Sequence, residues 1–223
     1  MTDSRILKTY EEEELEKLLK KLDTQNWLTE YDESKNQLSF SRKQSLSIRL
    51  PFCFTYQNEK LKSSNFMIVL IHSGEAALAY SEDDQITEHK MVKAYMVRQK
   101  QGKSQIKHLK TKGKSKAGSR VRLAGTDHFF EEINQKIAEW DEYFAIDKIA
   151  ISCNKTLQPY FFNRTDAALK KDDDRLFKIP KHIQEANFEN LTSIHNYLIS
   201  TEFKFHDSDT KFIQSIISDL DNE

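Results

Sequence analysis

The sequence predicts an α/β (α+β) fold in which a mixed sheet is flanked by helices. Strand-like and helix-like apolar patterns alternate along its 223 residues, which is typical of layered domains. Only five glycines and three prolines occur, which leaves little room for flexible linkers or a turn-rich sandwich. A composition of 38% apolar and 31% charged residues is that of a globular chain. This length suits one domain with a short appendage, so we expect a lead-in helix within residues 1–30 and the main domain over 31–223.

The first half of the chain predicts one helix followed by a meander of strands. Leucines repeat at helical spacing over 9–22, and a run of glutamates lies near the start of this pattern, where the helix dipole favours negative charge. Alternating apolar residues predict a half-buried strand at 46–50. Continuous apolar runs predict a buried strand at 66–71 and a return strand at 76–80, and a third strand is expected over 86–97.

The second half predicts mainly helices. Apolar residues return to helical spacing after Thr126 or Asp127, either of which can act as an N-cap. A buried strand is expected at 148–152, and residues 157–169 are expected to be helical from Pro159 onward. Helical spacing also predicts two C-terminal helices over 185–220.

The sequence predicts a cytoplasmic protein that does not act in a membrane. Its charged first residues lack the apolar run of a secretory signal. The longest apolar stretch, 66–71, is far shorter than the roughly 20 residues that cross a bilayer. Cys53 and Cys153 have neither metal-ligand spacing nor the density of a disulfide scaffold, so we expect both to be reduced core residues.

Charge is distributed unevenly along the chain, because residues 89–126 form a strongly basic segment. It contains no Asp or Glu, although the formal net charge of the whole chain is −1, so the remainder carries an excess of acid. Glycines at 102, 113 and 118 predict that residues 98–125 form a long basic loop. The twelve cations of the basic segment are Lys90, Lys93, Arg98, Lys100, Lys103, Lys107, Lys110, Lys112, Lys114, Lys116, Arg120 and Arg122.

This density of like charge favours a polyanionic partner. Unpartnered cations repel one another, and each phosphate that they neutralise releases a condensed counterion, so nucleic acid is the leading candidate. Two alternatives stay open on composition alone. The basic segment could be a solvated loop such as a localisation signal, or it could pair with the acidic remainder of the chain.

A candidate catalytic group lies inside the basic segment, at Gly102, Ser104 and Gln105. A glutamine cannot serve as a general acid or base near neutral pH, but its amide donates and accepts hydrogen bonds at once. It can therefore position a water or a ribose hydroxyl for in-line attack, while neighbouring cations stabilise the developing charge. On chemistry alone, such a string is more typical of an ordinary loop than of a catalytic tip.

Two stretches of the sequence resemble one protein family. The first is HKMVKAYMVRQKQGKSQ at 89–105 with AGSRVR at 117–122, and the second is LKKDDDRL at 169–176 with Ile179-Pro180. In this order and at this spacing they resemble the release-factor-like (VLRF) domain of the Vms and ankyrin/zinc-finger peptidyl-tRNA hydrolase family. The similarity spans about residues 40–200.

The resemblance implies a fold like the middle domain of eukaryotic and archaeal release factors. It also implies action on tRNA or peptidyl-tRNA at the large ribosomal subunit, as a tRNA 3′-end endonuclease or a peptidyl-tRNA hydrolase that frees stalled nascent chains. Gln105 would be the catalytic glutamine, with Gly102 and Ser104 as its scaffold, and no cofactor or metal is implied. His89 would be accessory, although a histidine on a strand edge is more typically structural. The RNA-binding candidates are Arg98, Lys100, Lys103, Lys107, Lys110, Lys112, Lys114, Lys116, Arg120 and Arg122.

The sequence also departs from the family pattern. Lys103 stands where the family has a second glycine, and lysine tolerates a positive φ less well. A non-catalytic RNA- or ribosome-binding module is therefore one alternative, and a protein-interaction domain is another. The ankyrin repeats and zinc finger of the eukaryotic relatives are absent from the sequence, which suggests a stand-alone bacterial-type member that acts as a monomer.

Other aromatic and acidic residues are expected to be structural. Trp27, Trp140, Phe161 and Phe162 could stack on bases, but each fits an apolar pattern that predicts core packing. The aspartates at 172–174 are expected to be solvated or to pair with the basic segment, because adjacent carboxylates on a loop rarely converge on one Mg²⁺ ion.

Overall fold

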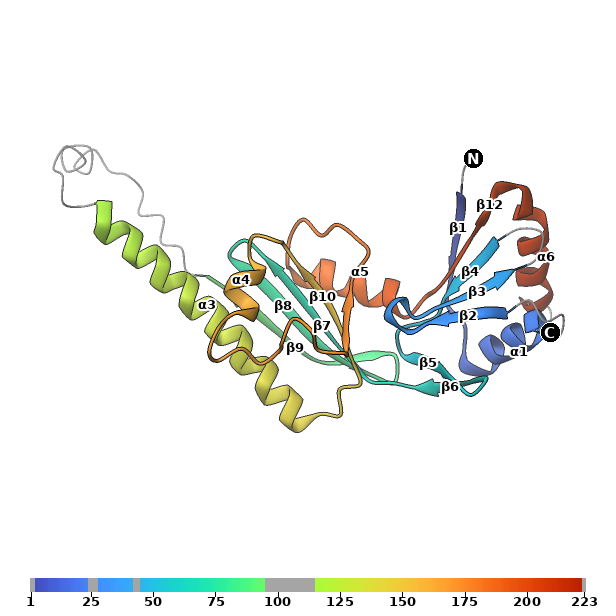
Figure 1. Ribbon diagram of the computed structural model, residues 1–223, viewed down its shortest axis with the longest axis horizontal. Coiled ribbons are helices and arrows are strands. Elements are labelled where there is room, and N and C mark those ends of the chain that lie inside the picture. The colour runs from blue at the N-terminus through green and yellow to red at the C-terminus, as the bar shows by residue number, and fades with distance from the viewer. Residues whose placement is uncertain (1–2, 24–27, 42–44, 95–114, 222–223) are drawn as a thin grey trace. The chain divides into compact units, whose positions relative to one another are not determined.

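The computed structural model describes residues 3–23, 28–41, 45–94 and 115–221 and shows a mixed α/β (α+β) fold (Figure 1). The predicted fold class is confirmed. Contacts divide the chain into two compact units: unit 1 comprises Met1–Phe66, Ser81–Thr87 and Thr192–Glu223, and unit 2 comprises Met67–Tyr80 and Glu88–Leu191. The predicted division into residues 1–30 and 31–223 stays a prediction.

The sheet of unit 2 has five strands in the order β11-β10-β7-β8-β9. Strands β10 and β11, at one side of this sheet, run parallel, with Ile149 opposite Leu176. The turn between β7 and β8 contains Gly74 at a φ of 80°. The strand bounds are β7 Phe66–His72, β8 Glu75–Glu82, β9 Gln85–Lys93, β10 Lys148–Cys153 and β11 Leu176–Lys178.

Helix α3, Ser115–Tyr143, crosses one face of this sheet (Figure 1). Its apolar residues recur every three or four positions, which places them on one side of the helix. They pack against alternate residues of β7 and β8, which share a face for the same geometric reason. This core cluster includes Phe129, Phe130, Ile133, Ile137 and Trp140 from α3 and Met67, Val69, Ile71, Ala76, Leu78 and Tyr80 from the strands.

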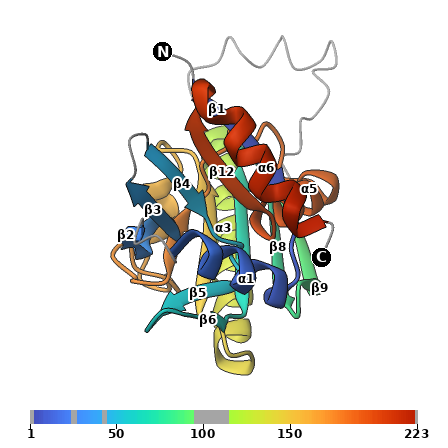
Figure 2. The same ribbon diagram turned by 90° about the vertical axis from the view of Figure 1, so that its right-hand side faces the viewer.

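The sheet of unit 1 also has five strands, in the order β1-β12-β4-β3-β2 (Figure 2). All its pairings are antiparallel, and β1 near the N-terminus pairs with β12 near the C-terminus, with Asp3 opposite His206. A separate hairpin joins β5 to β6. The strand bounds are β1 Asp3–Lys8, β2 Leu28–Asp32, β3 Gln37–Ser41, β4 Ser45–Arg49, β5 Phe54–Gln57, β6 Lys60–Ser63 and β12 Thr201–His206.

Short and amphipathic helices complete the fold. The predicted lead-in helix is confirmed as α1, Glu12–Asp23, whose Leu15 and Leu18 are fully buried. The two predicted C-terminal helices are confirmed as α5, Phe188–Leu198, and α6, Thr210–Asp221. The described residues also include α4, Gln158–Phe162, and 3₁₀ turns at Glu33–Lys35 and Asp207–Asp209.

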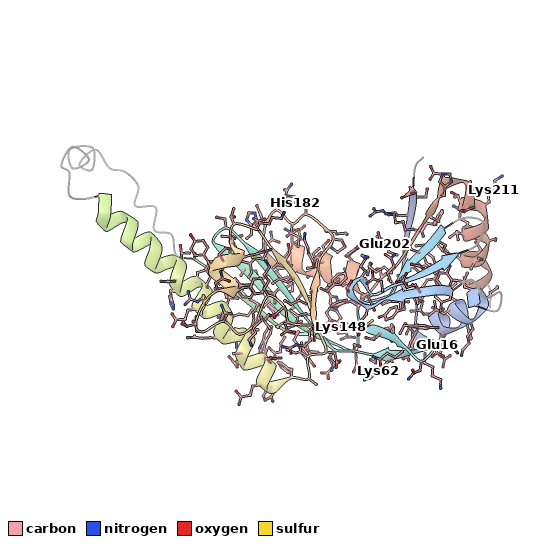
Figure 3. The ribbon with its side chains drawn as sticks, in the orientation of Figure 1. Glu16, Lys62, Lys148, His182, Glu202 and Lys211 are labelled. Carbon is pink, nitrogen blue, oxygen red and sulfur yellow. The ribbon has the colours of Figure 1, made fainter. Side chains whose placement is uncertain are left out.

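A buried arginine ties the sheet of unit 1 together. Arg49 is 6% exposed, and its guanidinium donates to Glu202 at 3.2 Å and to the carbonyl oxygens of Tyr197 and Ser200 at 3.0 and 3.1 Å. The guanidinium also lies 4.4 Å from the centre of the Tyr197 ring. Glu202 is marked on β12 in Figure 3. These contacts compensate the charge of Arg49 and join β4 to β12 and the turn before it.

The prediction of a basic loop over 98–125 is wrong for residues 115–125, which are helical. Helix α3 begins at Ser115, well before the predicted start at Thr126 or Asp127. A glycine inside a helix costs only about 1 kcal/mol relative to alanine. Because the later turns of α3 are anchored by their buried face, the helix continues through Gly118 and Gly125. Residues 95–114 lie outside the described part of the chain.

Two other predicted boundaries are also wrong. Strand β9 ends at Lys93, before the predicted end at 97. Helix α4 ends at Phe162, whereas a helix was expected within 157–169. The chain after α4 is held by side chains instead: the backbone N–H of Ala168 donates to Oδ1 of Asn134 at 2.9 Å. Such bonds to α3 replace the bonds that a longer helix would make.

Several structural expectations are confirmed. Trp140 and Phe161 are buried, whereas Trp27 lies outside the described residues. Both cysteines are free, with Cys53 buried and Cys153 packed against the core of unit 2. Among the described helices, none has both the length and the apolar character needed to span a bilayer.

Candidate nucleic-acid interface

The predicted site residues fall into three groups. Most of them, including Gly102, Ser104 and Gln105, lie within 95–114 and so outside the described residues. Lys116, Arg120 and Arg122 belong to the first turns of α3, which extend beyond the sheet of unit 2 (Figure 1). His89 lies on β9 and is exposed, with its ring centre 4.9 Å from that of Phe188. The predicted roles of all these residues stay predictions.

Residues 95–114 connect two elements that are well anchored. On the side of β9, the backbone N–H of Ala94 donates to the carbonyl oxygen of Gly74 at 2.8 Å. Gly74 has the positive φ of the β7–β8 turn, and a Cβ added there would lie 3.8 Å from the Cβ of Ala94. The chain is therefore fixed to the turn at the point where it leaves the sheet.

On the other side, α3 is anchored by buried polar contacts as well as by its apolar face. Asn134 is 1% exposed, its amide donates to the carbonyl oxygen of Phe130 at 2.9 Å, and its oxygen accepts from Ala168. Arg164, in the loop after α4, donates to Asp127 at 2.9 Å and to Asp166 at 2.7 Å. Both carboxylates keep the pKa of Arg164 above its ordinary value, so this ion pair persists at any physiological pH.

Two cations of the basic segment are paired with acids of unit 2. The ammonium of Lys90 on β9 lies 3.1 Å from Glu132 on α3, and that of Lys93 lies 3.8 Å from Glu75 on β8. Both ion pairs are substantially exposed, so each contributes at most about 1 kcal/mol. They link β9 to its neighbours and show that part of the charge in the basic segment is compensated within the unit.

The second stretch that carried the family resemblance forms an ion-pair network. Arg175 donates to Asp173 at 2.9 Å and to Asp141 on α3 at 3.1 Å. Asp173 and Asp141 together raise the pKa of Arg175, and Arg175 lowers the pKa of Asp173 through hydrogen bonding. The backbone of Arg175 also accepts from Ile149 at 2.8 Å, which fixes the start of β11 against β10. Sequence reasoning missed this structural role of Arg175, although the aspartates followed by arginine at 172–175 were visible.

Outside the basic segment, the described residues offer no cluster for a metal ion, and the buried serine–histidine pair of unit 1 is structural. Within the residues that the structure describes, no group of three His, Cys, Asp or Glu side chains could hold a metal ion. In unit 1 the Oγ of Ser81 lies 2.9 Å from Nε2 of His195, but both residues are at most 5% exposed. Burial lowers the pKa of His195, and its ring stacks on Phe66 with centres 5.8 Å apart, which is typical of a structural pair.

The described geometry therefore defines a rigid frame on either side of residues 95–114. A strand and a long helix, both anchored in one core, hold the two ends of a segment that is rich in cations and contains Gln105. Such a frame can present cations to phosphates while its own core stays fixed.

Together, the mixed sheet, the long helix and the basic segment between them define a release-factor-like domain of the VLRF type. The chain belongs to the Bacteroidetes VLRF1 release factor family, whose model matches residues 66–206, more than half of the chain. The match includes both stretches on which the resemblance was based, so the predicted family is confirmed and the protein has a release-factor-like role.

Other comparisons add little to this assignment. A solved structure described as "Vms1 mitochondrial localization core" is similar to this chain at 15% identity and a TM-score of 0.43, covering 81% of this chain and 79% of that one. No curated protein matches the sequence.

Proposed function

We propose that this protein acts on tRNA at the large ribosomal subunit and thereby frees stalled nascent chains. In this proposal the basic segment, residues 89–126, contacts phosphates of the tRNA acceptor end, and Gln105 orients the attacking group. The observation that carries the proposal is an acid-free segment that runs from β9 into α3, with twelve cations and one Gly-Lys-Ser-Gln string, in a member of a release factor family.

The chemistry of the segment supports either of two cleavages. Gln105 can accept a hydrogen bond from a ribose 2′-hydroxyl that attacks the neighbouring phosphorus, with loss of the 5′-oxygen of the next nucleotide. It can equally hold a water that attacks the ester carbonyl of peptidyl-tRNA, with loss of the ribose oxygen. In both cases positive charge nearby stabilises the anionic transition state, and positioning supplies most of the remaining rate.

The decisive experiment compares Gln105→Ala with the wild-type protein on peptidyl-tRNA bound to isolated large subunits. The RNA 3′ ends and the released peptide are resolved separately, so the assay identifies the bond that is cut. We expect the substitution to lower product formation by about 100-fold, as loss of one transition-state hydrogen bond typically does. Gln101→Ala is the matched control, because it removes a glutamine from the same segment outside the string. Equal product from the Gln105 variant and the wild type would remove Gln105 from the mechanism.

A second candidate function is binding to RNA or the ribosome without catalysis. Lys103 favours it, because this residue replaces the glycine that the family has at this position. Lys103→Gly tests the point directly. If lysine limits catalysis through backbone strain, the glycine variant should cleave faster while its affinity for tRNA changes little. If neither protein yields product while both bind large subunits, the binding module is the better description.

A protein-interaction domain is the remaining alternative, and the ion pairs of Lys90 and Lys93 with glutamates give it some support. Salt-titrated tRNA binding distinguishes it from the two RNA-based functions. For a phosphate-binding segment, the logarithm of the binding constant falls linearly with the logarithm of the salt concentration. The slope becomes steeper by about 0.7 to 0.9 for each phosphate contacted. Absence of tRNA binding at low salt would favour an acidic protein partner.

A further inference from the structure

Unit 2 contains a cavity beyond the carboxyl ends of its two parallel strands. The cavity has a volume of about 450 Å³ and is lined by the ends of β10 and β11 and the chain that follows each of them. The N–H of Ile179 donates to the carbonyl oxygen of Ile151 at 3.0 Å, so the pairing of these strands continues to the rim. In open α/β sheets, ligands bind in crevices outside the carboxyl ends of parallel strands.

The floor of the cavity is apolar and fixed. Ile151 and Ile179 are buried, and Phe162 at the end of α4 is half-buried against Phe161, with ring centres 4.7 Å apart. The side-chain amide of Gln158 donates to the carbonyl oxygen of Cys153 at 3.4 Å, which joins α4 to the end of β10. A planar group with apolar faces, such as a nucleobase, can therefore be received without rearrangement of the core.

The rim of the cavity is strongly basic. Lys155, Lys171, Lys178, Lys181 and His182 line it, and no lining residue in the described chain is acidic. All five side chains are exposed, and His182 projects outward from the loop after β11 (Figure 3). Lys155, Lys171 and Lys178 make no ion pair within the described part of the chain. Their charges repel one another, so an anion in the cavity would stabilise the folded protein.

Two nearby groups that could cancel this charge, Asp173 and Cys153, do not do so. Asp173 is close to Lys171 in sequence, but its carboxylate is bonded to Arg175. Cys153 lines the cavity, yet burial raises the pKa of its thiol to about 11, so the thiol stays neutral near pH 7. The cavity therefore combines a net positive rim with an uncharged floor.

We infer that this cavity binds a nucleotide, with its phosphate among the lysines and its base over the apolar floor. The volume is in the range of small-molecule sites, roughly 300–1,000 Å³. The same chemistry would be offered by a free mononucleotide or by one nucleotide unit of an RNA chain. The inference does not rest on the proposed action of Gln105, because none of the lining residues belongs to 95–114.

The test uses the full chain with isotope-labelled isoleucine methyl groups, titrated with AMP, inorganic phosphate and a 5′-phosphorylated RNA hexamer. We expect the methyl signals of Ile151 and Ile179 to shift in a saturable way while those of Ile48 in unit 1 stay unmoved. The double variant Lys171→Gln/Lys178→Gln should weaken this binding at least about tenfold, the effect of one lost charge-assisted hydrogen bond. The matched control is Lys60→Gln/Lys62→Gln, which removes two exposed lysines of β6 and should leave the affinity within about twofold.

The outcomes distinguish a free mononucleotide from a nucleotide unit of an RNA chain. Saturable shifts with AMP identify a mononucleotide site, and shifts with the hexamer alone identify a contact to an RNA chain. Shifts with inorganic phosphate at millimolar concentration confirm that the phosphate group is recognised. The inference is overturned if none of the three probes moves Ile151 and Ile179, or if the control double variant weakens binding as much as the cavity double variant. The unfolding midpoints of all variants are compared so that a loss of fold is not mistaken for a loss of binding.

Discussion

The two five-stranded sheets of this protein bury their strands in different ways. In unit 2, β7 is covered on both faces, and every residue from Met67 to Ile71 is at most 3% exposed. In unit 1, β12 alternates, so that Phe203 and Phe205 are buried while Lys204 between them is exposed. A strand covered on both faces needs a continuous apolar run, whereas a strand with one covered face needs only every second residue to be apolar.

The two units also differ in how an arginine joins distant parts of the chain. Arg49 in unit 1 lies inside the sheet and satisfies two backbone carbonyls as well as Glu202. Arg175 in unit 2 lies nearer the surface, with 29% of its side chain exposed, and bonds to carboxylates and to one weakly placed carbonyl at 3.5 Å. The comparison shows that the role of an arginine depends on how far its partners are removed from water.

Alanine substitutions at neighbouring positions of β7 and β12 should test the different burial of the two strands most directly. Met67→Ala and Ile68→Ala, in the strand covered on both faces, should each lower the free energy of unfolding by about 2–5 kcal/mol. In β12, Phe203→Ala should cost about 3–5 kcal/mol, whereas Lys204→Ala should stay within about 1 kcal/mol because its ion pair with Asp3 is exposed. Denaturant unfolding measures all four. A large loss at Lys204, or a small loss at either position of β7, would contradict the difference between the sheets.

Substitution of the more buried arginine, Arg49, should cost more stability than substitution of Arg175. Arg49→Ala should lower the free energy of unfolding by about 3 kcal/mol, because Glu202 loses its buried cationic partner and the carbonyl groups of Tyr197 and Ser200 lose a donor. Arg175→Ala should cost about 1–2 kcal/mol, since water can reach part of the site. Lys35→Gln, which breaks an exposed ion pair with Asp32, is the control and should have almost no effect. If the loss at Arg175 exceeded that at Arg49, burial would not be the deciding factor.

The Ser81–His195 pair of unit 1 should make stability depend on pH. Burial lowers the pKa of His195 below its ordinary value of 6.5, so the unfolded chain takes up a proton at a pH where the folded protein does not. The stabilisation is complete above pH 6.5 and is lost as the pH falls through the lower folded-state pKa. Thermal midpoints of the wild type and His195→Gln, taken between pH 8 and 5, should converge as the pH falls. His72→Gln is the control, and a parallel fall in all three proteins would contradict the role of His195.

The smallest effect is expected at the ion pair between β9 and α3. Lys90→Gln should lower the free energy of unfolding by less than about 1 kcal/mol, because both side chains of the pair with Glu132 are more than a third exposed. Added salt should reduce the difference further. Chemical unfolding at two salt concentrations provides the measurement. A loss of several kcal/mol would mean that this pair, and not the apolar face of α3, holds the helix to the sheet.

Some elements could be predicted from the sequence and others could not. The strands with continuous apolar runs, β7, β8 and β10, and the helices with leucine or isoleucine stripes, α1, α5 and α6, were correctly predicted. The alternating strand β4 was also predicted at 46–50. The strands β1, β2, β3, β5, β6, β11 and β12 were missed, because a short strand or one with a single covered face contains few apolar residues. The candidate site was predicted in sequence, yet the ion pairs of Lys90 and the network of Arg175 needed partners more than 30 residues away.

The family, the separation of charge and the elements whose apolar pattern is complete within a few turns or one strand could be recognised without a structure. Such patterns depend only on local repeats of the chain, so they can be recognised without knowledge of its partners. Only the tertiary structure decided that β1 pairs with β12, that α3 starts at Ser115, and that four lysines and His182 surround one cavity. These features arise from contacts between distant segments, whose free energy is not encoded in any one stretch of sequence.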